Sequence, residues 1–184
     1  EMLRLVFQTG NGITLPISGT GTAGMEAALV NTLEPGDSII VAVNGYFGNR
    51  LVQVAERCSV TVHKVEYEWG HPVSPEAIEG EFKKHSKIKA VAMVHAETST
   101  GVLSPVAEIA RIAHDHDALA IVDAVTSLGG GQRRAQPQTV CLRAGRHRRE
   151  ADRRRALQSA GPRDAEQSLR WRERPLRPDR LLLY

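Results

Sequence analysis

Short apolar runs alternate with helical patterns through the first 130 residues. Four short runs rich in β-branched or apolar residues predict strands, at residues 37–43, 59–65, 88–95 and 118–122. Apolar residues with helical spacing predict helices that follow residues 18–24, cover residues 46–57, and begin near Ser74 and Ser104. Strands that alternate with helices indicate an α/β fold with a mostly parallel sheet and helices on both faces. A ligand site in such a sheet lies beyond the carboxyl ends of the strands.

The helix expected near Ser74 has a clearly specified start. Ser74 is a favoured N-cap residue, and Pro75 suits the first helical position. Val73 precedes the cap and is placed to pack on Ile78, four positions into the helix. Together these residues fix where the chain enters the helix.

Residues 18–24 read S-G-T-G-T-A-G and open the first predicted helix. The first backbone N–H groups of a helix have no partner within it, and the helix dipole favours an anion there. Gly19, Gly21 and Gly24 also match the dinucleotide fingerprint, which requires an acid after the next strand. That strand is followed by Asn44, whereas Asp37 precedes it. The loop predicts a phosphate site, and a nucleotide-binding α/β domain stays open as an alternative.

Three further groups follow predicted strands and therefore meet at the same edge of the sheet. Residues 44–48 supply an aromatic ring, residues 95–101 supply hydroxyl groups, and Asp123 supplies a carboxylate. A phosphate site, a ring, hydroxyls and a carboxylate together suit pyridoxal phosphate, which has a phosphate, a flat ring, a phenolic oxygen and a pyridinium nitrogen. Each residue taken alone could equally be a core residue, a cap or a turn.

Five blocks of the chain resemble class V pyridoxal-phosphate aminotransferases, in register and in order. They are residues 18–28, 34–37, 44–50, 95–101 and 121–130. The resemblance covers residues 1–130 and is nearest to the alanine–glyoxylate and serine–pyruvate branch. It implies part of the large domain of the aspartate-aminotransferase-like enzymes, known as fold type I. It also implies pyridoxal 5′-phosphate as cofactor, transamination between alanine or serine and glyoxylate or pyruvate, and a homodimeric parent.

The resemblance also implies a role for particular residues. Thr20, Gly21 and Thr22 would bind the phosphate, and Phe47 would stack on the pyridine ring. Many members of the family have tryptophan at the position of Phe47, so its stacking surface is smaller here. Thr98 would lie by the phenolic oxygen, and Asp123 would pair with the pyridinium nitrogen, which keeps the ring an electron sink.

The family's Schiff-base lysine has no counterpart in this chain. The resemblance places it downstream of Asp123, where residues 146–150 read R-H-R-R-E, and the last lysine is Lys89. Arginine stays protonated and does not replace it. The family's small C-terminal domain has no counterpart either. No catalytic residue is therefore assigned, and the chain is expected to be an inactive fragment of an aminotransferase.

The balance of charge changes after residue 130, where the resemblance ends. Residues 1–130 carry nine basic and fifteen acidic side chains, whereas residues 131–184 carry fifteen arginines, no lysine and six acidic side chains. The second segment lacks a periodic apolar pattern, so it is either a disordered basic tail or a product read out of frame, and we favour the latter. A basic adaptor that binds nucleic acid through this tail is a further alternative, although no specific recognition of nucleic acid is expected.

Composition limits the remaining possibilities. The chain of 184 residues could form one domain, and no apolar run approaches the roughly 18 residues that a membrane helix needs. Its two cysteines form no C-x-x-C motif or disulfide framework. The sequence H-D-H-D at residues 114–117 lacks a distant third ligand, so no metal site is predicted. We expect a cytoplasmic protein, or a peroxisomal one for a eukaryotic parent.

Overall fold

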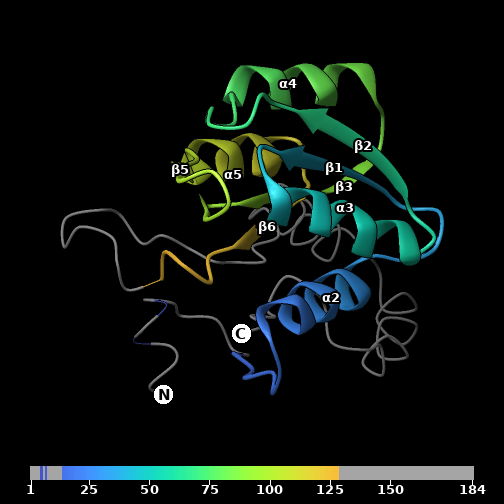
Figure 1. Cartoon of the computed structure of the whole chain (residues 1–184). Helices are drawn as coiled ribbons and strands as arrows, with labels where there is room; N and C mark the ends of the chain where they lie inside the picture. The colour runs from blue at the N-terminus through green and yellow to red at the C-terminus, as the bar shows by residue number, and fades with distance from the viewer. Residues whose placement is uncertain (1–4, 6, 8–13, 129–184) are drawn as a thin grey trace, which may run out of the picture.

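Four parallel strands form the central sheet of the protein, which we describe from a computed structural model covering Leu5, Phe7 and residues 14–128 (Figure 1). Their order is β2 (Thr61–Glu66), β1 (Ser38–Val43), β3 (Ile88–Val94) and β6 (Leu119–Asp123). All three pairings are parallel, so the strands end at the same edge. The predicted segment 131–184 lies outside the described residues.

Helices cover both faces of this sheet, as predicted. On one face, α3 (Tyr46–Arg57) packs on alternate residues of β1, including Ile39 and Val41, and α2 (Gly21–Thr32) packs against α3 and β6 in the same apolar cluster. On the other face, α4 (Pro75–Lys84) and α5 (Val106–Asp115) pack around Ile40. Both faces of β1 are therefore apolar, which is why the run at residues 38–43 shows no alternation of polar and apolar residues.

Of the two helices expected to begin near a serine, one is capped by that serine and the other is not. Ser74 Oγ accepts a hydrogen bond from the N–H of Ala77 at 3.2 Å, and Val73 and Ile78 are buried in one cluster, as predicted. The next helix begins at Val106, and Ser104 does not cap it. Ser104 is buried and its hydroxyl instead accepts a hydrogen bond from Asn44 Nδ2 at 3.3 Å.

The boundaries of two other elements differ from the prediction. Strand β2 begins at Thr61 because Ser59 adopts a left-handed conformation, with φ of 57°, in the turn after α3. Helix α2 begins at Gly21, inside the glycine-rich loop, because the carbonyl of Thr20 accepts hydrogen bonds from the N–H groups of Ala23 and Gly24. The glycine-rich residues therefore form the first turn of the helix.

A small hairpin beyond β3 was not predicted. Strands β4 (Ala96–Glu97) and β5 (Val102–Leu103) pair antiparallel, and the N–H groups of Thr100 and Gly101 close the turn on the carbonyl of Glu97 at 3.2 and 2.8 Å. Two-residue strands leave too few positions for a periodic pattern to be recognised. The hairpin holds residues 96–103 at the carboxyl edge of the sheet.

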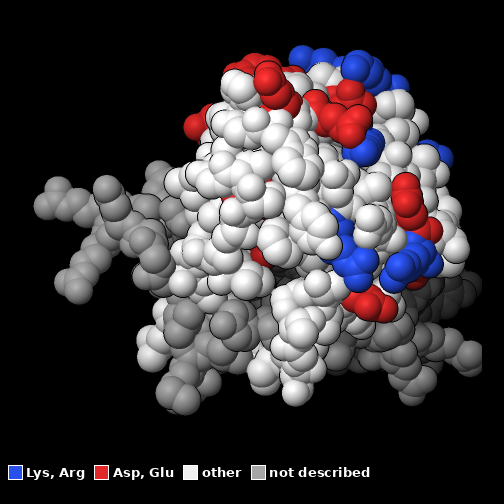
Figure 2. All heavy atoms as spheres, in the orientation of Figure 1, with Lys and Arg blue, Asp and Glu red and all other residues white. Residues whose placement is uncertain are grey.

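Charged side chains of both signs lie side by side on the surface. Figure 2 shows basic and acidic residues together over α4, where Lys83 pairs with Glu79 and Lys84 with Glu81. Within the described residues, none of the helices is apolar over a length that could cross a membrane.

Candidate functional site

A cavity of about 270 Å³ opens at the carboxyl edge of the sheet, between the start of α2, the start of α3 and the ends of β3 and β6. Its volume is close to the lower limit of small-molecule sites, which is roughly 300 Å³. All six residues that the sequence predicts to bind a cofactor line this cavity: Thr20, Gly21, Thr22, Phe47, Thr98 and Asp123. The structure thus brings together residues from four separate parts of the chain.

The start of α2 forms one end of the cavity. Thr20 precedes the helix, and its side chain makes no capping hydrogen bond. The N–H groups of Gly21 and Thr22 occupy the first positions of the helix, which α-helical geometry leaves without a partner in the helix. Two hydroxyls and the positive end of the helix dipole therefore meet here, and this is an arrangement that suits a phosphate group.

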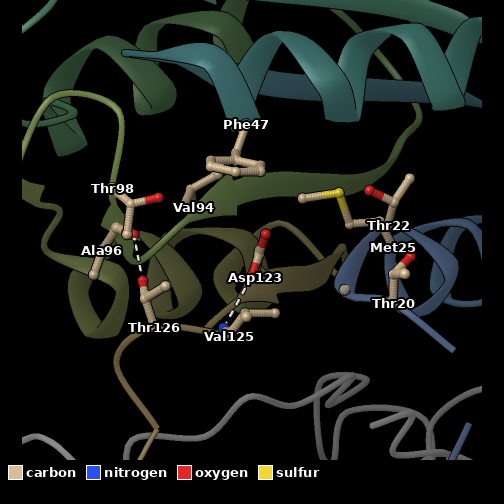
Figure 3. Close-up of a pocket in the computed structure, with 11 residues that line it drawn as sticks. Thr20, Thr22, Met25, Phe47, Val94, Ala96, Thr98, Asp123, Val125 and Thr126 are labelled. Atoms are coloured by element: carbon tan, nitrogen blue, oxygen red, sulfur yellow. Dashed lines mark hydrogen bonds between the residues drawn. The ribbon is translucent and has the colours of Figure 1, made fainter.

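Phe47 and Asp123 lie on opposite sides of the cavity. Figure 3 shows the ring of Phe47 extending from the start of α3, with the carboxylate of Asp123 pointing toward it from the end of β6. Val94 pairs with Asp123 across β3 and β6, and the N–H of His95 donates to the carbonyl of Asp123 at 2.8 Å. The strand ladder therefore fixes the backbone that carries this carboxylate.

The carboxylate of Asp123 is in an unfavourable setting for a charge. Burial raises its pKa, and the negative charge of Glu97 raises it further, whereas a hydrogen bond from the N–H of Val125 at 3.0 Å lowers it. A cationic group placed against Asp123 would favour the ionised form and reverse this shift. The pyridinium nitrogen of a phosphopyridine is a cation of this kind.

Thr98 lies at the end of the cavity opposite Thr20 and Thr22 (Figure 3). It belongs to the turn between β4 and β5. The hydroxyl of Thr126 donates a hydrogen bond to the carbonyl of Ala96 in β4 at 2.8 Å. This link ties the segment after β6 to the hairpin after β3. Hydroxyl groups therefore stand at both ends of the cavity, and a ring and a carboxylate stand between them.

Five lining residues were not predicted: Met25, Val94, Ala96, Val125 and Thr126. Val94 is the last residue of β3, one position before the end of the predicted strand 88–95, and could have been found by the rule that sites lie at carboxyl ends. Met25 and Val125 carry no chemical signature of a site. A buried carboxylate just behind the cavity, Glu97, was also missed, although it lies within a block that the sequence singled out.

The donor set fits a phosphopyridine better than a dinucleotide. No acid follows β1, and the carboxylate of Asp37 is used at the opposite end of that strand, where it accepts the N–H of Glu34 at 2.9 Å. None of the residues lining the described cavity is a lysine. The residues present can therefore hold a phosphate, cover a flat ring and face a ring nitrogen without a covalent link.

Comparison with known proteins gives a consistent result. Residues 6–147 match the family described as aminotransferase class-V. The chain is 48% identical over 130 residues to the (S)-ureidoglycine–glyoxylate transaminase of Bacillus subtilis, which covers 71% of this chain and 31% of that protein. It is 40% identical over 130 residues to the alanine–glyoxylate aminotransferase of Callithrix jacchus, with coverage of 71% and 31%.

A solved structure agrees with these matches. The crystal structure of ureidoglycine–glyoxylate aminotransferase from Bacillus subtilis superposes with a TM-score of 0.68 at 47% identity, covering 71% of this chain and 34% of that one. This likeness confirms the predicted α/β fold. The chain spans about a third of the length of the curated relatives it matches.

Proposed function

The chain belongs to the class V aminotransferase family, and from this premise we propose that its cavity binds pyridoxal 5′-phosphate or its amine form. The observation that carries the proposal is the convergence of six predicted residues on one cavity. Membership of the family supports transamination as the activity of the parent protein.

Each lining group has a defined task in this proposal. The start of α2 with Thr20 and Thr22 binds the phosphate, Phe47 covers one face of the ring, and Thr98 faces the phenolic oxygen. Asp123 holds a proton on the ring nitrogen. When bound, the cofactor supplies an electron sink for the carbanion formed at the α-carbon of an amino acid.

The substrates of the parent are small amino acids and 2-oxo acids. Glyoxylate is named in both curated relatives, which supports it as the amino acceptor, with pyruvate as the other candidate. Alanine or serine is the proposed amino donor. We further propose that the parent is a cytoplasmic or peroxisomal homodimer, and that this chain alone does not catalyse turnover because it lacks a lysine beyond Lys89.

Binding of pyridoxamine 5′-phosphate to the full chain tests the proposal directly, because this amine needs no lysine to bind. We expect saturable binding by calorimetry, and we expect Thr22→Val to weaken it about tenfold because a hydroxyl donor is lost. Thr61→Val, an exposed threonine on strand β2, is the matched control and is expected to bind as the unaltered chain does.

Two outcomes would contradict the proposal. One is the absence of saturable binding of either phosphopyridine. The other is NAD binding that is lost in Gly21→Ala without affinity for phosphopyridines, which would favour the nucleotide-binding alternative. Measurable transaminase turnover, with pyridoxal phosphate covalently attached to a lysine, would contradict the inactivity of this chain.

A further inference from the structure

The start of α3 is capped from a distant part of the chain. Its N-cap residue is Gly45, which has no side chain to serve the first N–H groups of the helix. The carboxylate of Glu97 takes this place, since Oε2 accepts hydrogen bonds from the N–H groups of Phe47 and Gly48, both at 3.1 Å. Glu97 lies some 50 residues further along the chain and is only 1% exposed.

Ser99 extends the same cap. Its hydroxyl accepts the N–H of Tyr46 at 2.9 Å and donates to Oε1 of Glu97 at 2.6 Å, and its own N–H donates to Oε1 at 3.1 Å. Three consecutive N–H groups of α3 are therefore held by two residues of the β4–β5 hairpin. Every oxygen of the buried carboxylate has a donor, which makes the burial of its charge tolerable.

Gly45 makes this close approach possible. A Cβ atom at Gly45 would collide with Cγ and Cδ of Glu97 and would lie 2.6 Å from the hydroxyl of Ser99. The glycine is therefore required by the approach of Glu97 rather than by its own φ of 176°, which is an extended conformation. The helix start and the hairpin fit together only without a side chain at this position.

Two residues that line the cavity, Phe47 and Thr98, belong to the segments joined by this cap. Phe47 donates its own N–H to Glu97, and Thr98 lies between Glu97 and Ser99 in the chain. We propose that Glu97 is a positioning residue that fixes Phe47 relative to Thr98 and so sets the space in which a flat ring is held. This inference rests on the proposed function for the identity of the ring.

A test without ligand examines the positioning itself. In the unaltered full chain, hydrogen exchange measured by NMR is expected to be slow at the N–H groups of residues 46–48, which are normally unprotected at a helix start. Glu97→Ala is expected to speed exchange at residues 47 and 48 by about tenfold or more, because those groups lose a charged acceptor. Ser99→Ala is expected to speed exchange mainly at residue 46.

A test with ligand separates ring placement from general loss of structure. For Glu97→Ala we expect the dissociation constant for pyridoxamine 5′-phosphate to rise about tenfold. The constant for inorganic phosphate is expected to stay within about twofold, because the start of α2 lies at the other end of the cavity from Thr98 and makes no hydrogen bond to Glu97. Ile109→Val, on the opposite face of the sheet, is the matched control and should change neither constant.

The outcomes distinguish the positioning role of Glu97 from the proposed binding of a phosphopyridine. If Glu97→Ala does not fold, Glu97→Gln replaces it, since the amide keeps the size of the side chain but exchanges one acceptor oxygen for a donor. Unchanged exchange at residues 47 and 48, or equal weakening of both ligands, overturns the positioning role. If the unaltered chain binds no phosphopyridine, the proposed function fails, and the exchange pattern alone decides whether Glu97 positions Phe47.

Discussion

Gly48 brings helix α3 so close to strand β1 that a Cβ atom on it would lie 3.0 Å from the Cα of Val43 and 3.1 Å from the carbonyl oxygen of Ala42. Both neighbouring atoms belong to the backbone and cannot rotate away. Gly48→Ala is therefore expected to push α3 off the sheet and to lower the free energy of unfolding by about 1–3 kcal/mol. Urea unfolding measures this loss, and the displaced Phe47 should also weaken binding of pyridoxamine 5′-phosphate.

Gly80→Ala is the matched control for that experiment. Gly80 lies inside α4, where an added Cβ atom would meet nothing within 4 Å. Alanine favours the helix over glycine, so this change is expected to raise the free energy of unfolding by up to about 1 kcal/mol. Equal destabilisation by the two changes would show that the close approach at Gly48 is not what limits that position.

Asp123→Asn should separate stability from binding. The pKa of Asp123 is raised in the folded protein above its ordinary 3.8, so the contribution of this group to stability is present below that pH and is lost as pH rises through the folded pKa. Asparagine carries no such charge and can still accept the N–H of Val125. We expect Asp123→Asn to melt at a higher temperature than the unaltered chain at neutral pH, with the advantage disappearing in acid.

The same change should weaken the binding of pyridoxamine 5′-phosphate, because an amide cannot form an ion pair with a pyridinium cation. Melting curves across pH and calorimetric titration at neutral pH give the two quantities. A neutral-pH melting temperature below that of the unaltered chain would show that the ionised carboxylate stabilises the fold. Unchanged affinity would show that Asp123 does not face the ring nitrogen.

Helix α2 is attached to the sheet by few apolar side chains. Met25 and Leu29 are its buried apolar residues, and both belong to the cluster on the β1 face that also includes α3. Leu29→Ala is expected to cost about 2–5 kcal/mol of unfolding free energy because it leaves a cavity under the helix. Val30, the next residue, is 57% exposed, and Val30→Ala should change stability by less than about 0.5 kcal/mol.

The parts of this fold that local pattern determines could be predicted from the sequence. The four strands, the cap at Ser74 and the helix Tyr46–Arg57 depend on neighbouring residues, and the structure contains all of them, with β2 as a partly exposed edge strand. The carboxyl-edge rule then placed Asp123 and Thr98 near one another, because parallel strands end together. The β4–β5 hairpin and the cap formed by Glu97 could not be predicted, because they depend on contacts between segments far apart in the chain.

Two stacked histidines lie on the side of the sheet opposite α3, and they should make the stability of the protein depend on pH. The rings of His63 on β2 and His85 after α4 stack with centroids 3.7 Å apart, and His85 lies 3.3 Å from Glu81. Burial lowers the pKa of His63 below 6.5, the charge of His85 lowers it further, and Glu81 opposes both. The unfolded chain therefore binds the proton more readily, and stability falls as pH drops through 6.5 toward the folded pKa.

His63→Phe keeps an aromatic ring against His85 but cannot gain a proton. Its melting temperature is expected to fall less than that of the unaltered chain between about pH 7.5 and pH 5.5. His71→Phe is the control, because His71 is an exposed histidine outside the stack. Parallel pH profiles for the unaltered chain and His63→Phe would show that the stacked pair does not contribute to acid sensitivity.

Phe47 offers the most direct measurement of ring stacking in the cavity. The ring is half-buried, lies nearly perpendicular to the ring of Tyr46 at a centroid distance of 5.3 Å, and lines the cavity. Phe47→Leu should lower the affinity for pyridoxamine 5′-phosphate by up to about tenfold, since an aromatic pair contributes about 0.5–1.5 kcal/mol beyond its buried area. Phe47→Trp should strengthen binding, because the larger ring covers more of the pyridine. Phe82→Leu, at the α4 face, controls for the loss of an aromatic side chain and should leave affinity unchanged. If Phe47→Leu and Phe47→Trp both bind as the unaltered chain does, the ring of the ligand does not stack on residue 47.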